Sequence, residues 1–362
     1  MTNRDRLGEL FRTGKIAVER GALFERHLVP KPTAFDFDRV EGMLLGVAVG
    51  DGLGITTEGR LPGERGAAHG RIRDYLPNRY TGDRRGYPSD DTQLTFWTLE
   101  QMILDRGFVP ERVAARLARG RIFGIGSTVR QFLVNLKSGK PWYESGPGSA
   151  GNGALMRISP MLIPHLKTGG TEIWVDTALS AMMTHNDPAS ISACLAYVAM
   201  LWDLLDMEGP PDRQWWVDRY VALARDLEGA AEYSPRGGAM TGYRGPLWRF
   251  VQEHVPSADR EGLSVADACG RWYSGAFLLE TVPSVLFILT RHADDPEEAI
   301  LAAVNDTKDN DSIAAIVGAA VGALHGRRGI PQRWLANLSG RTTDRDEGRV
   351  FSLLGQARSV FG

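Results

Sequence analysis

Two short acidic clusters, Ser89-Asp90-Asp91-Thr92 and Asp309-Asn310-Asp311-Ser312, lie more than two hundred residues apart in this chain. If folding brought them together, carboxylates, hydroxyls and an amide would converge. Carboxylates at that density repel one another unless a proton or a cation intervenes. Oxygen ligands without histidine or cysteine suit Mg²⁺ or Mn²⁺ much better than Zn²⁺. The pattern therefore predicts a divalent metal site.

A structural interpretation competes with this one. Each cluster precedes an apolar segment with helical potential, Gln93 to Glu100 after the first and Ile313 to Gly318 after the second. Serine, aspartate, asparagine and threonine are the preferred N-cap residues, and the helix dipole favours acidic side chains in a first turn. A cap needs only one such residue, however, and neither cluster stops at one. The repetition favours the metal interpretation.

A glycine-rich run from Gly42 to Gly54 precedes the first cluster. Each isolated glycine costs a helix about 1 kcal/mol against alanine, so their density needs a reason. Close packing against another helix is one reason, and passage beneath a ligand is another. The run ends near Asp51 and Glu58, two carboxylates that would face the same cavity in the second case. Glu58 taken alone is more often a solvated surface residue.

Two further glycine-containing turns are typical of ligand-binding loops. Gly126, Ser127 and Thr128 lead into a predicted helix, where free backbone N–H groups can hold a phosphate. The turn-rich passage 138–153 ends in Gly151-Asn152-Gly153, and its glycines let the backbone wrap closely around a ligand. A plain start of a helix explains the first turn equally well. His185 lies at a helix junction, where it is either a structural histidine or a ligand contact.

Composition narrows the class of protein. With 42 basic and 44 acidic residues among 362, the chain has no general attraction to nucleic acid or acidic membranes. Its two cysteines, Cys194 and Cys269, are isolated, which excludes a CxxC motif and argues against a disulfide framework. Charged residues interrupt the N-terminus where a signal peptide would be apolar, and no long apolar stretch suits a bilayer. We expect a cytoplasmic protein that binds neither nucleic acid nor membrane.

Apolar periodicity predicts a compact, nearly all-helical domain over residues 38–362, preceded by an extension over residues 1–37. Spaced apolar anchors in the extension predict one or two amphipathic helices that fold back on the body; the alternative is that they reach into a partner protein. Residues 60–88 and 230–262 lack periodicity and are expected to be irregular. The predicted helices span 91–106, 110–119, 129–136, 171–184, 188–207, 212–228, 263–270, 275–290, 295–304, 311–326 and 347–360, with another beginning at 154.

Five motifs in this order resemble the ADP-ribosylglycohydrolase family, of the dinitrogenase-reductase-activating and ADP-ribosylarginine hydrolase type. The resemblance covers about residues 40–360. One departure is Lys308-Asp309-Asn310-Asp311-Ser312, where the family commonly has Gly-Asp-Thr-Asp-Thr; serine keeps the hydroxyl, and Asn310 falls between ligands. The motifs are Gly42 to Gly46 with Gly50-Asp51, Ser89 to Gln93, Gly151 to Arg157, His185, and Asp309 to Ala314.

The resemblance implies an orthogonal all-helical bundle with two Mg²⁺ or Mn²⁺ ions at the base of a cleft. It also implies hydrolysis of the N-glycosidic bond between ADP-ribose and a protein arginine, with Asp91 or Glu58 accepting a proton from water. Another linkage, to serine or to a small molecule, is the alternative. The implied metal ligands are Ser89, Asp90, Asp91, Asp309, Asp311 and Ser312, and the implied substrate contacts are Gly126, Ser127, Thr128, Gly151, Asn152, Gly153 and His185.

Some bacterial members of this family are immunity proteins against secreted ADP-ribosyltransferase toxins, and they carry an N-terminal extension that blocks the toxin's active site. The resemblance implies the same second role for residues 1–37. The expected partners are therefore an ADP-ribosylated protein substrate and, through the extension, such a toxin.

Overall fold

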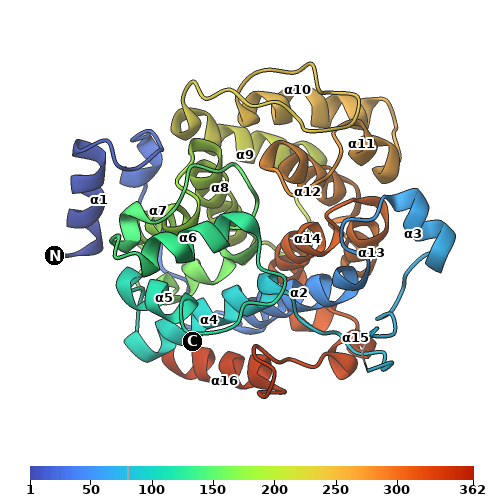
Figure 1. The fold of residues 1–362 in the computed structure, drawn as a ribbon, viewed down its shortest axis with the longest axis horizontal. Helices are drawn as coiled ribbons and strands as arrows, with labels where there is room; N and C mark the ends of the chain where they lie inside the picture. Colours follow the sequence, from blue (N-terminus) through green and yellow to red (C-terminus); the bar gives the residue numbers. More distant parts are fainter. Residues whose placement is uncertain (80) are drawn as a thin grey trace.

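The computed structural model describes residues 1–79 and 81–362, and helices form its regular structure (Figure 1). No β-strand occurs within these two ranges, where the sheet-like pairings are isolated bridges such as Gly151 with Phe277. The predicted all-α fold is confirmed. The α-helices are α1 (Asn3–Arg12), α2 (Asp38–Gly54), α3 (Pro62–His69), α4 (Asp90–Asp105), α5 (Pro110–Leu117), α6 (Ser127–Lys137), α7 (Glu172–Thr184), α8 (Pro188–Leu204), α9 (Arg213–Glu228), α10 (Leu247–Arg260), α11 (Val265–Arg271), α12 (Leu278–His292), α13 (Pro296–Asp306), α14 (Asn310–His325), α15 (Gln332–Asn337) and α16 (Arg349–Phe361).

Helices α2 and α14 lie side by side at the centre of the molecule (Figure 1). Glycines at every fourth position of α2 share one face of that helix. A Cβ atom on Gly46 would lie 1.9 Å from the carbonyl oxygen of Gly318, and one on Gly50 would lie 2.1 Å from that of Ala314. The two backbones are thus in direct contact, which accounts for the glycine-rich run through helix packing. The α2 glycines of this face are Gly42, Gly46, Gly50 and Gly54.

The pair is antiparallel, and this brings two acidic side chains to the same end. Gly42 at the start of α2 contacts Gly326 just beyond α14, whereas Gly54 at the end of α2 contacts the backbone of Asp311 in the first turn of α14. Asp51, one turn before the end of α2, therefore lies at the end of the pair where α14 begins.

Other helices enclose this pair so completely that α14 is buried from Asn310 to Leu324. A helix that is apolar on all sides belongs in a core. Within the described ranges, the stretch Asp38–Thr57 is long and apolar enough to cross a membrane, but 89% of its apolar window is buried inside the fold. Cys194 and Cys269 are buried and free, as expected.

The N-terminal extension folds back on the helical domain, which agrees with the first of the two alternatives given for residues 1–37. Leu7 and Leu10 of α1 are buried, and α1 packs on α7. Asn3 donates to the carboxylate of Asp176 at 2.7 Å and to the Phe108 carbonyl at 2.9 Å. These contacts attach the extension to the surface of the helical domain.

Three local predictions are wrong. Residues 60–88 contain α3, which begins at Pro62, and residues 230–262 contain α10, whose Leu247, Phe250 and Val251 face the core. Glycines and prolines within and beside both helices obscured their apolar periodicity. The helix expected from residue 154 is instead two 3₁₀ turns, Leu155–Arg157 and Ser159–His165; prolines within the second remove the N–H donors that an α-helix needs.

Candidate metal centre

The two acidic clusters meet at the end of the central helix pair. The Ser312 hydroxyl donates to Asp91 Oδ2 at 3.4 Å, across a separation of 221 residues. Side-chain oxygens of Asp51, Asp91 and Asp311 lie within 4.8 Å of one another, and so do those of Glu58, Asp309 and Asp311. The predicted convergence of the clusters is confirmed, and Asp311 belongs to both groups of carboxylates.

The Asp51 carboxylate accepts hydrogen bonds from the first turn of α4. Its Oδ2 accepts hydrogen bonds from Ser89 N at 2.9 Å, from Thr92 N at 3.1 Å and from the Thr92 hydroxyl at 2.5 Å. These donors satisfy the carboxylate, and Asp51 does not line the cavity described below. We therefore infer that Asp51 orients α4. Its distance from Asp91 and Asp311 alone would also fit a metal ligand.

Asp91 has one oxygen that is bound and one that is not. Its Oδ2 accepts from the hydroxyls of Ser89 at 3.0 Å and Ser312 at 3.4 Å, whereas Oδ1 is buried without a hydrogen-bond partner. Leaving a buried carboxylate oxygen unsatisfied is costly, more so than for a neutral group. A hard cation at Oδ1 would supply the missing partner, and the donors around it are all oxygens. The residues present therefore fit a Mg²⁺ or Mn²⁺ ion.

The carboxylates also raise one another's pKa. Burial and the charge of Asp51 raise the pKa of Asp90 to about 8, and burial with neighbouring charges raises those of Asp91 and Asp311 well above the ordinary value. Burial and the nearby Asp309 raise the pKa of Glu58, which stands at the exposed rim. Without a cation, the cluster holds protons near neutral pH.

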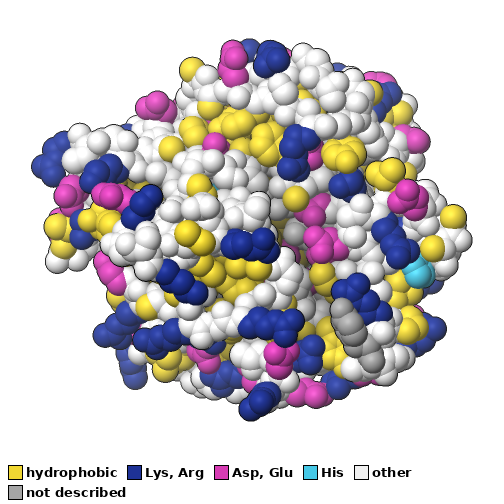
Figure 2. Space-filling model, viewed as in Figure 1, with side chains coloured by type: hydrophobic (Ala, Val, Ile, Leu, Met, Phe, Trp, Pro, Cys, Tyr) yellow, Lys and Arg dark blue, Asp and Glu magenta, His cyan; other side chains and the backbone are white. Residues whose placement is uncertain are grey.

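A cavity of about 510 Å³ opens above this cluster. Figure 2 shows acidic side chains gathered in the hollow on this face, with Lys and Arg side chains around its edge. Glycine-rich backbone forms the opposite wall. The predicted site residues that line the cavity are Glu58, Asp90, Asp91, Gly126, Ser127, Thr128, Gly151, Asn152, Gly153, His185, Asp309, Asp311 and Ser312.

The N-terminus of α6 points its first turn at the cavity. Gly126 occupies the N-cap position without a side-chain cap, so the first N–H groups of α6 are left for a ligand. Thr128 and Ser149 approach each other at 3.0 Å through their hydroxyls and join this turn to the second glycine-rich turn. Free N–H groups and the helix dipole together suit a phosphate.

The second turn connects the metal centre to His185. Asn152 donates to Asp309 Oδ2 at 2.6 Å and to the Thr281 hydroxyl at 3.1 Å, so it orients the carboxylate. His185 is buried, and burial lowers its pKa to about 3, so the ring is neutral at physiological pH. A Cβ atom on Gly153 would lie 2.9 Å from the His185 ring, which explains why this position is glycine.

Gly153→Ala should raise the KM for a substrate that occupies this cavity about tenfold, equivalent to about 1.4 kcal/mol, because the new methyl group displaces His185 from the cavity wall. Gly107→Ala is the control, since a Cβ there meets nothing within 4 Å and Gly107 does not line the cavity. Steady-state kinetics compare the two. Equal KM values would contradict the expected role of His185 in the cavity wall.

Two predicted residues take other positions. Ser89 is the N-cap of α4, accepting from Asp91 N at 3.2 Å, and it does not line the cavity, so its part in metal binding stays a prediction. Arg157, the last residue of the Gly151 to Arg157 motif, is fully buried and donates to Ser180 and Thr184 in α7. The 3₁₀ turn that carries Arg157 directs it into the core.

Sequence reasoning missed Arg236 and Phe277 at the cavity mouth. The Arg236 guanidinium lies 5.0 Å from the centre of the Phe277 ring and 3.2 Å from Glu280. Glu280 also accepts from Arg236 N at 2.6 Å, and a glutamate within the apolar segment 275–290 needs such a partner when it is buried. In the sequence, only the need of a buried Glu280 for a partner pointed to this contact, and it did not indicate which residue the partner would be.

Comparisons with known proteins agree with this geometry. Residues 32–359 match the family model described as ADP-ribosylglycohydrolase. The chain is 27% identical to an ADP-ribosyl-[dinitrogen reductase] glycohydrolase of Rhodospirillum rubrum over 88% of its own length and 97% of the relative's. It is 26% identical to the ADP-ribosylarginine hydrolase Tri1 of Pseudomonas putida (strain GB-1), over 83% and 74% of the two lengths.

A solved structure described as an ADP-ribosylglycohydrolase-related protein complex has the same fold. It aligns with a TM-score of 0.63 and 25% identity, covering 90% of this chain and 97% of that one. The matched range includes both acidic clusters, the two glycine-rich turns and His185. This helical hydrolase, with its carboxylate cluster suited to a metal ion, belongs to the ADP-ribosylglycohydrolase family.

Proposed function

We propose that this protein removes ADP-ribose from arginine side chains of proteins by hydrolysing the N-glycosidic bond, with two Mg²⁺ or Mn²⁺ ions. The observation that carries the proposal is the buried, unpartnered Asp91 Oδ1 on the floor of a cavity whose other wall offers free N–H groups. The printed names of the two relatives, a glycohydrolase of ADP-ribosyl-[dinitrogen reductase] and an ADP-ribosylarginine hydrolase, support the substrate class.

Two overlapping groups of carboxylates would hold the ions. Asp91 and Asp311 would serve one ion, with the Ser312 hydroxyl beside them, and Asp309 and Asp311 would serve the other, with Glu58 close enough to accept a proton from a water there. Such an ion, when bound, lowers the pKa of a nearby water and stabilises negative charge that develops on oxygen. Asp90 also lines the cavity, where its carboxylate can hold a further ligand or water.

The chain's own residues would position the substrate. The N–H groups at the start of α6 and the turn Gly151-Asn152-Gly153 would receive the pyrophosphate, and the neutral ring of His185 would contact a ribose. The surrounding carboxylates favour the positive charge that builds on the anomeric carbon as the bond breaks.

Glu58 is the better placed of the two candidate proton acceptors. Asp91 Oδ2 is taken by two hydroxyls and its Oδ1 faces the cation position, whereas Glu58 reaches the cavity from the rim. The raised pKa of Glu58 brings it closer to neutrality, where a group can both take and release a proton. As the water oxygen bonds to the anomeric carbon, its proton would pass to a Glu58 carboxylate oxygen. The C–N bond would break with its electron pair going to the guanidino nitrogen, and Glu58 would then return the proton to that nitrogen.

One observation favours a different linkage as the second candidate. Arg236 stands half-exposed at the mouth, and its positive charge would repel the guanidinium of an ADP-ribosylated arginine. Glu280 offsets part of that charge. A serine-linked substrate would avoid the repulsion altogether.

The proposal predicts Mg²⁺-dependent release of free ADP-ribose from an arginine-linked protein, faster by at least tenfold than from a serine-linked one. Both substrates should be assayed side by side, with and without excess chelator. Activity that persists in chelator would contradict the metal-dependent reaction, and preference for the serine linkage would replace the arginine assignment with the second candidate.

We also propose that the exposed face of α1 binds an ADP-ribosyltransferase toxin. The charged residues Arg4, Asp5 and Arg12 remain exposed while Leu7 and Leu10 anchor the helix. Deleting residues 1–37 would uncover those anchors, so Arg12→Glu is the cleaner test. It should weaken binding to a purified arginine-specific toxin, measured by calorimetry, with hydrolysis unchanged. Unaltered toxin binding would count against a role of this face.

A further inference from the structure

Arg65 is a fully buried arginine in α3 that sequence reasoning passed over. Its guanidinium makes five hydrogen bonds, and every nitrogen takes part. Nε donates to the Thr57 hydroxyl at 3.0 Å, and Nη1 donates to the carbonyls of Asn305 at 3.0 Å and Thr307 at 2.8 Å. Nη2 donates to the carbonyls of Arg60 at 2.9 Å and Thr57 at 3.5 Å.

These acceptors belong to two segments that both lead into the metal centre. One is the loop that carries Glu58, and the other is the end of α13, two residues before Asp309. Asn310 reinforces the connection, because its side-chain amide donates to the same Thr57 hydroxyl at 3.0 Å. Arg65 therefore connects the loop that carries Glu58 to the segment that leads into the second acidic cluster.

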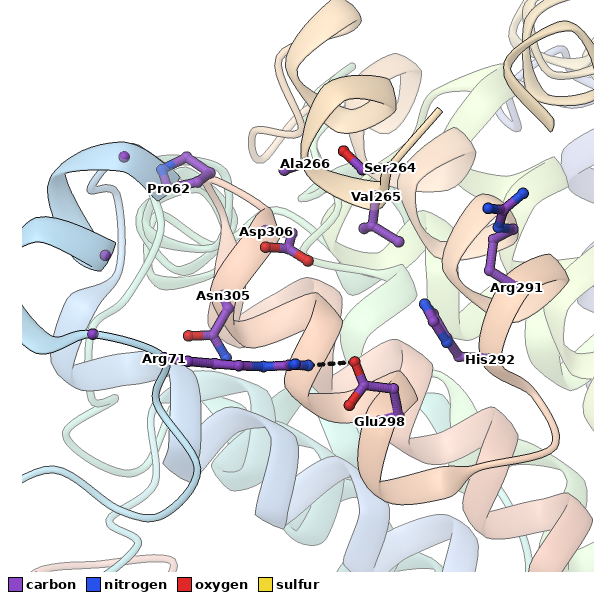
Figure 3. Close-up of a pocket in the computed structure, with 13 residues that line it drawn as sticks. Pro62, Arg71, Ser264, Val265, Ala266, Arg291, His292, Glu298, Asn305 and Asp306 are labelled. Carbon is purple, nitrogen blue, oxygen red and sulfur yellow. Dashed lines mark hydrogen bonds and ion pairs between the residues drawn. The ribbon is translucent and has the colours of Figure 1, made fainter. Parts of the chain in front are cut away.

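Few other contacts fix α3. A second cavity, of about 750 Å³, separates α3 from α11 and the end of α12. Figure 3 shows Pro62 on one side of this cavity and Val265, Arg291 and His292 on the other. Near its floor, Arg71 forms an ion pair with Glu298 of α13 at the surface. The buried guanidinium therefore connects α3 to α13, together with two hydrogen bonds between the Ile72 backbone and the Asn305 side chain just beyond α3.

The charge of Arg65 is not consumed by an ion pair with any described residue. Its acceptors are carbonyls and a hydroxyl, and the carboxylates nearest in effect are those of Asp306 and Asp311. A buried cation without a contacting partner acts on charges farther away, because the protein interior screens them weakly. Arg65 thus offsets part of the repulsion at the metal centre from behind.

We propose that Arg65 is a positioning residue, which holds the Glu58 loop and the segment before Asp309 in the register that metal binding and proton transfer require. The inference rests on the proposed function for its catalytic half and on geometry alone for its metal-binding half. Lysine at this position keeps the charge but carries its donors on one nitrogen, which cannot span both segments.

Arg65→Lys should weaken Mg²⁺ binding by about 10- to 100-fold, the range typical of residues that orient metal ligands. Binding is measured by calorimetry and by the Mg²⁺-dependent shift in Tm, neither of which needs activity. The kcat should fall by a similar factor. In a Glu58→Gln background and at saturating Mg²⁺, the same substitution should lower kcat little further, because the effect on catalysis that remains when the metal is bound passes through Glu58.

Arg39→Lys is the matched control. Arg39 donates to the carbonyls of Leu204 and Leu324 at helix ends, and Leu324 lies roughly 20 Å along α14 from Asp311. It should lower Tm with Mg²⁺ affinity unchanged. The proposal is overturned if Arg65→Lys behaves like this control, or if its effect on kcat multiplies fully with that of Glu58→Gln. A wild-type protein that binds Mg²⁺ without hydrolysing ADP-ribose would refute the proposed function, while the affinity comparison would still test Arg65.

Discussion

Replacing Asp311 with asparagine should abolish ADP-ribose release and, in the absence of divalent cations, make the protein more stable. Asp311 belongs to both carboxylate groups, so its loss removes a ligand from each proposed ion position. The same side chain is buried beside Asp91 and Asp309. Without a cation this charge is unfavourable, so neutralising it should raise stability by about 1 to 3 kcal/mol.

The pH dependence of this effect has a definite sign. The folded-state pKa values of Asp90, Asp91 and Asp311 lie above the ordinary value of 3.8, so the folded protein retains protons that the unfolded chain has lost. With respect to these three groups, the metal-free protein is therefore most stable at low pH. It should lose stability as pH rises from about 4 towards 8, the upper bound being the pKa of Asp90, about 8. Bound Mg²⁺ should reverse this loss.

Thermal unfolding at pH 5 and pH 8, with chelator and with Mg²⁺, measures both effects. Asp311→Asn should flatten the pH dependence and reduce the Mg²⁺-induced rise in Tm. Glu228→Gln is the control: Glu228 is a buried acid whose pKa burial raises to about 7, and it binds the first N–H groups of α10, away from the cavity. It should leave the Mg²⁺ response intact. A wild-type Tm that ignores Mg²⁺ would contradict the metal centre.

Gly46→Ala should destabilise the protein by about 3 kcal/mol or more, the upper range for overpacking. The added Cβ would lie 1.9 Å from Gly318 O and 2.4 Å from its carbonyl carbon, and backbone atoms cannot swing aside. Helices α2 and α14 would have to separate. Because these helices carry Asp51 and Asp311, Mg²⁺ binding should weaken together with stability.

The same glycine-to-alanine substitution at Gly355 should increase the stability of the protein. Gly355 is exposed within α16, and a Cβ there meets nothing within 4 Å. Alanine should therefore stabilise the helix by about 0.5 to 1 kcal/mol. Urea unfolding compares both variants with the wild-type protein. A Gly46→Ala variant as stable as wild type would mean that the backbones of α2 and α14 are not in contact.

Local features of the sequence determined the helical architecture and the composition of the metal centre. Three or four neighbouring residues determine a helix cap, and a continuous apolar segment indicates a buried helix. The starts of α4 and α14 could therefore be predicted. The same logic applies to Asp187, which caps α8 directly before Pro188. It failed at α10, where glycines before Leu247 conceal a short amphipathic helix.

Only the tertiary structure decided which groups face each other. The sequence contains Asp51 and Asp91 alike, but packing gives the first a full set of donors and leaves the second with a buried, unpartnered oxygen. Packing also places Arg236 beside Glu280, and it places carbonyls from two distant segments around the Arg65 guanidinium. The physical reason is that a hydrogen-bond partner is set by distances across the fold. No periodicity or composition within a segment encodes those distances.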